Sequence, residues 1–201
     1  SKMITLLISL LDDANKLIPA LEQAGRRHVT YNVKPHFYPM FGEGLLWAIQ
    51  QIIPKKEFLT VKHSWVKVYT VISAVMLEAA EGVPPKSPKE DTAHTKKIIK
   101  SDENDDGNIT KQDISNMKMS WDIVLDKTNQ GEQFGPLFYP KLFKLYPDTE
   151  DLFANVTDFK EQGLKLTKML TLAISKLDHL DVLIPKLQQS GIAHAGYNVK
   201  P

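Results

Sequence analysis

Apolar side chains recur along this chain every three or four residues, which is the spacing that gives a helix one buried face. The pattern starts near the N-terminus with Met3, Ile4, Leu7, Leu10 and Leu11. After Asp12 and Asp13 interrupt it, a second short helix beginning at Leu17–Gln23 carries the chain to His28. No stretch shows the strict alternation that a strand requires, so the pattern predicts helices only.

Five further stretches keep this helical spacing. One covers about residues 38–53 and the next about residues 57–81. The apolar stripe of the second stretch consists of Phe58, Val61, Trp65, Val68, Tyr69, Ile72 and Val75. Helices are also expected at about residues 114–127, after Gly131, and from about Asp158 onwards. We therefore expect an all-α fold in which helices of unequal length pack at varied angles.

Composition narrows the class of protein. With 201 residues the chain can bury one good core, with room for a small appendage. Its 25 basic and 24 acidic residues nearly cancel, so we expect neither nucleic acid nor a membrane as a partner. The longest apolar runs, from Met3 and from Leu45, are too short to span a bilayer. A soluble, cytoplasmic protein is favoured, although the absence of cysteine does not by itself fix the compartment.

The two ends of the chain repeat one another. Residues 1–35 align without a gap on residues 167–201, and both segments end in the letters YNVKP. His28 thereby matches His194. Such a repeat indicates tandem units in a longer parent protein, from which this chain is cut out of phase. The expected parts are residues 1–82 from one repeat, a proline-rich and charged linker at 83–116, and residues 117–201 from the next repeat.

An acidic loop lies within the linker. Residues 102–113, DENDDGNITKQD, follow the EF-hand pattern through its first nine positions. The oxygen ligands in this interpretation are Asp102, Asn104, Asp106, Asn108 through its carbonyl, Thr110 and Asp113. Asp113 stands where the pattern has glutamate, and its shorter side chain weakens calcium binding and favours magnesium. A second loop to pair with it is not found, so a polar turn between two helices stays open as the alternative.

Four residues in the second half of the chain have spacings that suit one buried planar ligand held from both faces. They are Tyr139, Phe153, Gln162 and His194. His194 follows Gln162 by 32 positions, which is room for a long helix, a proline-containing joint and a second helix that folds back. The pattern resembles the globin family, closest to the single-domain bacterial haemoglobins and the haem domain of flavohaemoglobins.

The resemblance covers residues 1–82 and 117–201 and implies a globin fold in permuted order. In the family's lettering, the first segment supplies the end of helix E and helices F, G and H. The second segment supplies helices A, B, C, E and F. The resemblance also implies one haem b, held without covalent attachment because the chain has no cysteine. His194 or its repeat mate His28 is the implied iron ligand, and His194 is favoured because it is contiguous with Gln162.

The resemblance gives four side chains roles around that haem. Tyr139 and Gln162 match the distal residues, and both side chains can donate hydrogen bonds to bound dioxygen. Phe153 matches the corner phenylalanine that wedges the haem, and Leu166 matches the apolar residue over the iron.

The axial side departs from the family's pattern. Tyr38 matches a tyrosine beside the axial histidine, but its glutamate partner aligns here with Ala80, with Glu78 and Glu81 nearby. In the family, this tyrosine and glutamate form a charge relay beside the axial histidine that supports peroxide or nitric oxide chemistry. The departure puts that relay in doubt. We expect reversible binding of dioxygen and other diatomic ligands, for storage, transport or scavenging, with calcium as a modulator. The alternatives are a calcium-responsive haem sensor and a nitric oxide dioxygenase, which needs a separate reductase because no GxGxxG motif occurs. Neighbouring globin repeats or self-association are the expected protein contacts.

Overall fold

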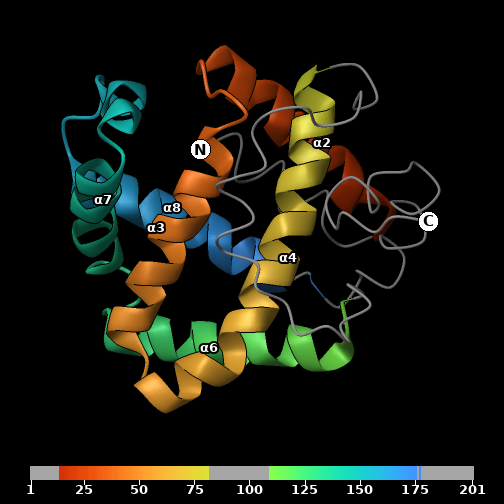
Figure 1. Ribbon diagram of the computed structural model, residues 1–201, viewed down its shortest axis with the longest axis vertical. Coiled ribbons are helices and arrows are strands. Elements are labelled where there is room, and N and C mark those ends of the chain that lie inside the picture. The colour runs from red at the N-terminus through yellow and green to blue at the C-terminus, as the bar shows by residue number, and fades with distance from the viewer. Residues whose placement is uncertain (1–13, 82–108, 176, 178–201) are drawn as a thin grey trace. The chain divides into compact units, whose positions relative to one another are not determined.

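The computed structural model describes residues 14–81, 109–175 and 177, and Figure 1 shows every element in them as a helix. The elements are α2 (Ala14–Thr30), α3 (Phe37–Ile52), α4 (Lys55–Glu81), α6 (Lys111–Lys127), α7 (Phe134–Leu145), the 3-10 helix η1 (Pro147–Phe153) and α8 (Phe159–Ser175). The all-helical prediction is confirmed for the described residues. None of these helices is long and apolar enough to cross a membrane.

Two helices begin earlier along the chain than the apolar pattern predicted. The helix expected from Leu17 is the 17-residue α2, which continues through Pro19. The helix expected from residue 114 begins at Lys111, and Asp113 lies in its first turn. A carboxylate is favourable there because it faces the positive end of the helix dipole.

The chain forms two compact units that interleave along the sequence. The first unit takes residues 1–35, 66–110 and 176–201, and the second takes residues 36–65 and 111–175. Helix α2 and the second half of α4 therefore belong to the first unit. Helices α3, α6, α7, η1 and α8 belong to the second, together with the first half of α4.

Large aromatic side chains make up the core of the second unit. The centroid of Trp121 lies 6.0 Å from that of Trp65 and 5.5 Å from that of Phe134. Phe134 in turn stacks on Phe138 at 6.1 Å, and all four residues are at most 2% exposed. Burial of one such ring removes roughly 150–250 Å² from water, which contributes at most about 4–6 kcal/mol. This row of rings joins α4 and α6 to α7.

A buried polar network ties α6 to the first half of α4. Ser64 donates a hydrogen bond of 2.8 Å to the carboxylate of Asp113, and Asn116 donates one of 3.0 Å to Ser64. One residue further along α4, the indole Nε1 of Trp65 donates to Ser120 Oγ at 2.9 Å. Both polar groups of each contact are buried, so each hydrogen bond offsets a desolvation cost.

Helices α7 and α8 cross at two glycines. A Cβ atom on either Gly135 or Gly163 would overlap the Cα atom of the other. Only glycine allows the two backbones to come so close. The crossing lies beside two of the predicted site residues, because Tyr139 lies one turn after Gly135 and Gln162 directly precedes Gly163.

A similar close approach joins α2 to α4 within the first unit. A Cβ atom on Gly25 would overlap the carbonyl oxygen of Met76, so the two helix backbones touch there. Gly25 lies three residues before His28. The contact therefore fixes α2 against α4 within one turn of the histidine.

Candidate functional site

Besides the adjacent Phe138, whose ring centroid lies 5.0 Å away, Tyr139 on α7 contacts three phenylalanine rings from three different elements. Phe143 comes from α7, Phe153 from η1 and Phe159 from α8. All six pairs among these four rings are in contact, with centroids between 5.1 and 6.5 Å apart. We call these residues the four-ring cluster. Tyr139 is its most buried member, at 2% exposed.

Burial moves the pKa of the Tyr139 hydroxyl further above the physiological pH range. Desolvation raises its pKa from 10.0 to about 12, and a hydrogen bond from the Gln162 side chain acts in the opposite direction. The hydroxyl therefore keeps its proton throughout the physiological pH range and serves as a neutral hydrogen-bond donor. Gln162 lies on α8, so the polar contact joins the two helices that cross at the paired glycines.

The structure brings together three of the residues that their spacing placed around one ligand. Tyr139 contacts Phe153 at 5.1 Å between centroids, and Gln162 hydrogen-bonds Tyr139. Phe143 and Phe159 complete the cluster and were not predicted. Helical periodicity could have predicted both residues. Phe143 follows Tyr139 by four positions and Phe159 precedes Gln162 by three, so each lies on the same helix face as a predicted site residue.

Leu166 lies on the same helix, one turn beyond Gln162. It is half-buried and occupies the face of α8 that Gln162 occupies. Its position is therefore compatible with the apolar role that the resemblance implies.

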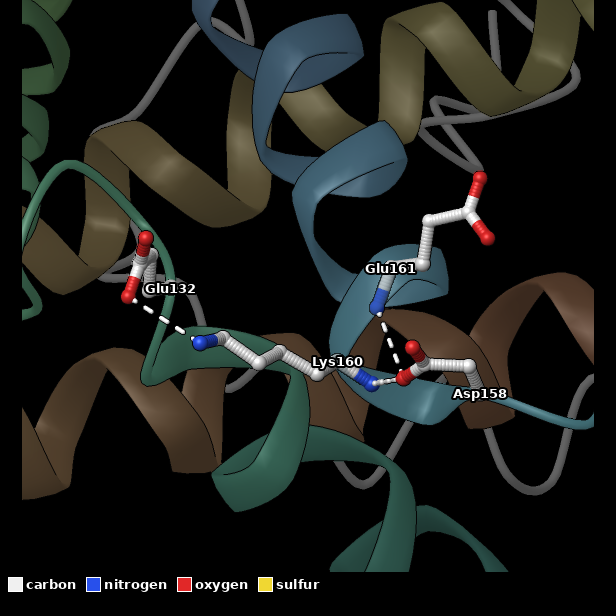
Figure 2. A network of polar contacts seen from close by, with 4 residues as sticks. All are labelled: Glu132, Asp158, Lys160 and Glu161. Carbon is white, nitrogen blue, oxygen red and sulfur yellow. Dashed lines mark hydrogen bonds and ion pairs between the residues drawn. The ribbon is translucent and has the colours of Figure 1, made fainter.

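The start of α8 is held by a network of polar contacts (Figure 2). The carboxylate of Asp158 accepts hydrogen bonds from the backbone N–H groups of Lys160 at 2.8 Å and Glu161 at 3.1 Å. These two groups have no partner inside the helix, so Asp158 acts as its N-cap. The side chain of Lys160 pairs with Glu132 at 3.3 Å, ahead of α7. The network fixes the helix register at which Phe159 and Gln162 emerge.

His28 on α2 has a defined tautomer. Its ring Nδ1 lies 2.7 Å from the backbone carbonyl oxygen of Ala24. A carbonyl oxygen only accepts hydrogen bonds, so Nδ1 carries the proton and the lone pair of the neutral ring is on Nε2. This arrangement is the one that orients a histidine for metal binding through Nε2. His28 belongs to the first unit and the four-ring cluster to the second.

The residues predicted beside the axial histidine are also described. Tyr38, in the first turn of α3, is 7% exposed, and burial raises the pKa of its hydroxyl. Glu78 lies on α4, and Ala80 follows it on the same helix. Burial raises the pKa of Glu78, and the nearby carboxylate of Glu22 on α2 raises it further. Glu78, one of the two carboxyl groups near the expected relay position, therefore lies close to another carboxyl group across the contact between α2 and α4.

Several predicted residues lie outside the described ranges. His194 is one, and the loop positions Asp102, Asn104, Asp106 and Asn108 are the others. The last two loop positions are described: Thr110 is exposed, whereas Asp113 is buried against Ser64. Within the described ranges, no group of three or more His, Asp or Glu side chains is arranged to hold a metal ion.

Comparison with known proteins places the chain in a family. A family model described as Globin matches residues 1–76 and 137–201. A neuroglobin of Tetraodon nigroviridis is 33% identical over 69 residues, which are 34% of this chain and 43% of that protein. A flavohemoprotein of Bacillus subtilis (strain 168) is 32% identical over 63 residues, or 31% of this chain and 16% of that protein. A flavohemoprotein of Oceanobacillus iheyensis is 28% identical over 67 residues, or 33% of this chain and 16% of that protein.

The chain thus spans less than half the length of each of these relatives. No solved structure matches it significantly. The family model nevertheless covers well over half of the residues, in two separate segments. The chain therefore belongs to the globin family, whose members bind haem and diatomic gases.

Proposed function

We propose that this chain holds one b-type haem without covalent attachment and uses it for the reversible binding of dioxygen, in storage, transport or scavenging. The haem supplies an iron centre to which a diatomic gas can bind. The observation that carries the proposal is the buried Tyr139 hydroxyl, which stays protonated and is hydrogen-bonded by Gln162 inside the four-ring cluster.

Tyr139 and Gln162 supply the donors on the gas-binding side in this proposal. The Gln162 amide lowers the pKa of Tyr139, as expected when an N–H group donates to the phenol oxygen. In that arrangement the proton of Tyr139 is available to a different acceptor. A bound gas molecule with partial negative charge is such an acceptor, and hydrogen bonds to charged groups contribute about 1.5–3 kcal/mol each.

His28 is prepared for the axial role by its hydrogen bond to Ala24, which places the ring proton on Nδ1 and orients the imidazole. His194 occupies the matching place in the repeat and competes for the same role. We infer that one of these two histidines binds the iron. Phe153 and Leu166 would supply apolar contacts on the gas-binding side, and Tyr38 would lie on the axial side, as in the family.

The axial hydrogen bond favours gas binding over a nitric oxide dioxygenase. A carboxylate acceptor would make the histidine a more basic ligand, whereas the Nδ1–H of His28 bonds to the neutral carbonyl of Ala24. Two of the relatives are named flavohemoprotein, but this chain covers only 16% of each. A dioxygenase activity of these 201 residues would need a reductase from elsewhere, since they contain no GxGxxG motif.

The permuted order of the globin segments is part of the proposal. The family match falls in two segments, residues 1–76 and 137–201, and both contain a copy of the 35-residue repeat. This supports a reading in which residues 1–82 and 117–201 come from successive globin units, joined by the linker at 83–116. Contacts with neighbouring repeats, or self-association, would follow because the two copies of the 35-residue repeat compete for one haem pocket.

Calcium or magnesium binding at residues 102–113 is a further part of the proposal. Asp113 Oδ1 accepts a hydrogen bond from Ser64, so bidentate coordination of a cation by Asp113 would compete with that hydrogen bond. Binding there would reach α4 and α6 directly, because both helices share this network. Calorimetry tests it: heat of binding in the intact chain that disappears in Asp102→Ala supports the loop, and no heat with either ion at millimolar concentration removes it.

Oxygen dissociation rates test the gas-binding role. Tyr139→Phe and Gln162→Leu should each release dioxygen roughly ten- to a hundredfold faster, which is the worth of one hydrogen bond to a charged acceptor. Stopped-flow measurement after mixing with carbon monoxide gives the rate. Tyr31→Phe is the matched control, because that hydroxyl belongs to a side chain that is 61% exposed. Rates unchanged in both site variants would show that neither side chain donates to the ligand.

A further inference from the structure

We propose that Phe159 is a positioning residue that sets the direction of the Tyr139 hydroxyl and so the rate of oxygen release. The inference rests on the proposed gas-binding role of Tyr139. Phe159 is the member of the four-ring cluster that belongs to α8, and its ring centroid lies 5.3 Å from that of Tyr139.

One helix provides both the packing and the polar contact of Tyr139. Phe159 precedes Gln162 by three positions, so the ring and the amide leave α8 on the same face. Phe159 holds the Tyr139 ring from the side, and Gln162 holds its oxygen. A displacement of the ring therefore changes the direction of the O–H bond even when the hydrogen bond to Gln162 persists.

The backbone around Phe159 is fixed on both sides. Asp158, immediately before it, caps α8 through the N–H groups of Lys160 and Glu161 (Figure 2). Gly163, four residues after it, lies against the Gly135 backbone of α7. Phe159 thus occupies a turn held at its start by the cap and at its end by the helix crossing. A residue in such a turn can act as a fixed stop for the Tyr139 ring.

The other two rings close the remaining sides. Phe143 contacts Phe159 at 5.5 Å, and Phe153 contacts it at 6.5 Å. Each phenylalanine therefore touches both of the others and Tyr139, which leaves the phenol ring little room to turn. Hydrogen bonds weaken steeply as the donor angle departs from linear, so a small rotation of the ring is enough to weaken donation to a bound gas.

Phe159→Leu removes the stop and keeps an apolar side chain. Oxygen release should become about two- to tenfold faster, the range to which the worth of one aromatic pair converts. Phe159→Tyr retains the ring and should restore a rate close to that of the unchanged protein. The C–O stretching frequency of the carbon monoxide complex, which responds to a nearby donor, should shift in Phe159→Leu and return in Phe159→Tyr.

Phe134→Leu is the matched control. Phe134 is a buried phenylalanine on α7 whose ring contacts are with Trp121 and Phe138. It should lower the free energy of unfolding at least as much as Phe159→Leu while leaving the oxygen off-rate and the C–O stretch unchanged. If Phe159→Leu does not fold, Phe159→Met, whose flexible unbranched side chain fills irregular space, takes its place.

A double-variant cycle separates this inference from the proposed function. In the Tyr139→Phe background there is no hydroxyl to direct, so Phe159→Leu should add no further acceleration. A faster rate in Tyr139→Phe with an unchanged rate in Phe159→Leu overturns the positioning role and leaves the proposed function intact. Equal acceleration by Phe159→Leu with and without the hydroxyl also overturns it. An unchanged rate in Tyr139→Phe itself would overturn both.

Discussion

Alkaline pH should reveal how firmly the fold keeps the Tyr139 hydroxyl neutral. Burial raises the pKa of this group from 10.0 to about 12 in the folded protein. The unfolded chain releases the proton near pH 10, whereas the folded chain keeps it. The stabilisation is therefore complete below pH 10 and is lost as the pH rises towards 12. A shift of about two pKa units corresponds to a loss of about 3 kcal/mol in the free energy of unfolding.

Tyr139→Phe isolates this contribution. Tyr146 and Tyr38 also have raised pKa values and titrate in the same range, but they do so in both proteins. Urea unfolding followed by circular dichroism at pH 8, 10 and 11 should show a decline that is steeper in the unchanged protein than in Tyr139→Phe. The control is Tyr31→Phe, which should decline like the unchanged protein because Tyr31 is exposed. Parallel declines in the unchanged protein and Tyr139→Phe would refute the claim that this hydroxyl is buried and neutral.

Four further substitutions test the packing and polar contacts that hold the site. Gly163→Ala should lower the free energy of unfolding by about 1–3 kcal/mol, because a methyl group there overlaps the backbone of α7. Asp158→Ala should cost about 1 kcal/mol through loss of the α8 cap, and Lys160→Ala should cost less because its ion pair is solvent-exposed. Ser64→Ala removes a donor to the buried Asp113 carboxylate and should cost about 1–3 kcal/mol. Urea unfolding measures all of these changes, and a neutral Gly163→Ala would contradict the close helix crossing.

Spacing and resemblance together grouped three residues that lie close to one another in the structure. Tyr139, Phe153 and Gln162 were placed around one ligand by spacing and by resemblance, and the structure brings them into contact. Phe143 and Phe159 escaped notice because a lone phenylalanine in a helix reads as ordinary core. Only the contacts among all four rings distinguish them from that core.

Other features depend on contacts between distant parts of the chain. Asp113 was assigned to a cation loop because it is acidic and follows other oxygen-bearing side chains. Its burial depends on Ser64, which lies 49 residues earlier in the sequence. The residues around Asp113 do not predict that contact. The close approach of Gly135 and Gly163 likewise depends on two helices that are separate in the sequence, and the helical spacing of either one does not predict it.

The visible absorption spectrum of the purified chain, reduced and saturated with carbon monoxide, tests the central claim most directly. We predict an intense Soret band equivalent to one haem per chain. His28→Ala combined with His194→Ala should abolish it, and the single variant that lowers it more identifies the axial ligand. His63→Ala, on the exposed side of α4, should leave it unchanged. A chain without a Soret band, or equal haem retention in the double variant and in His63→Ala, would contradict the account.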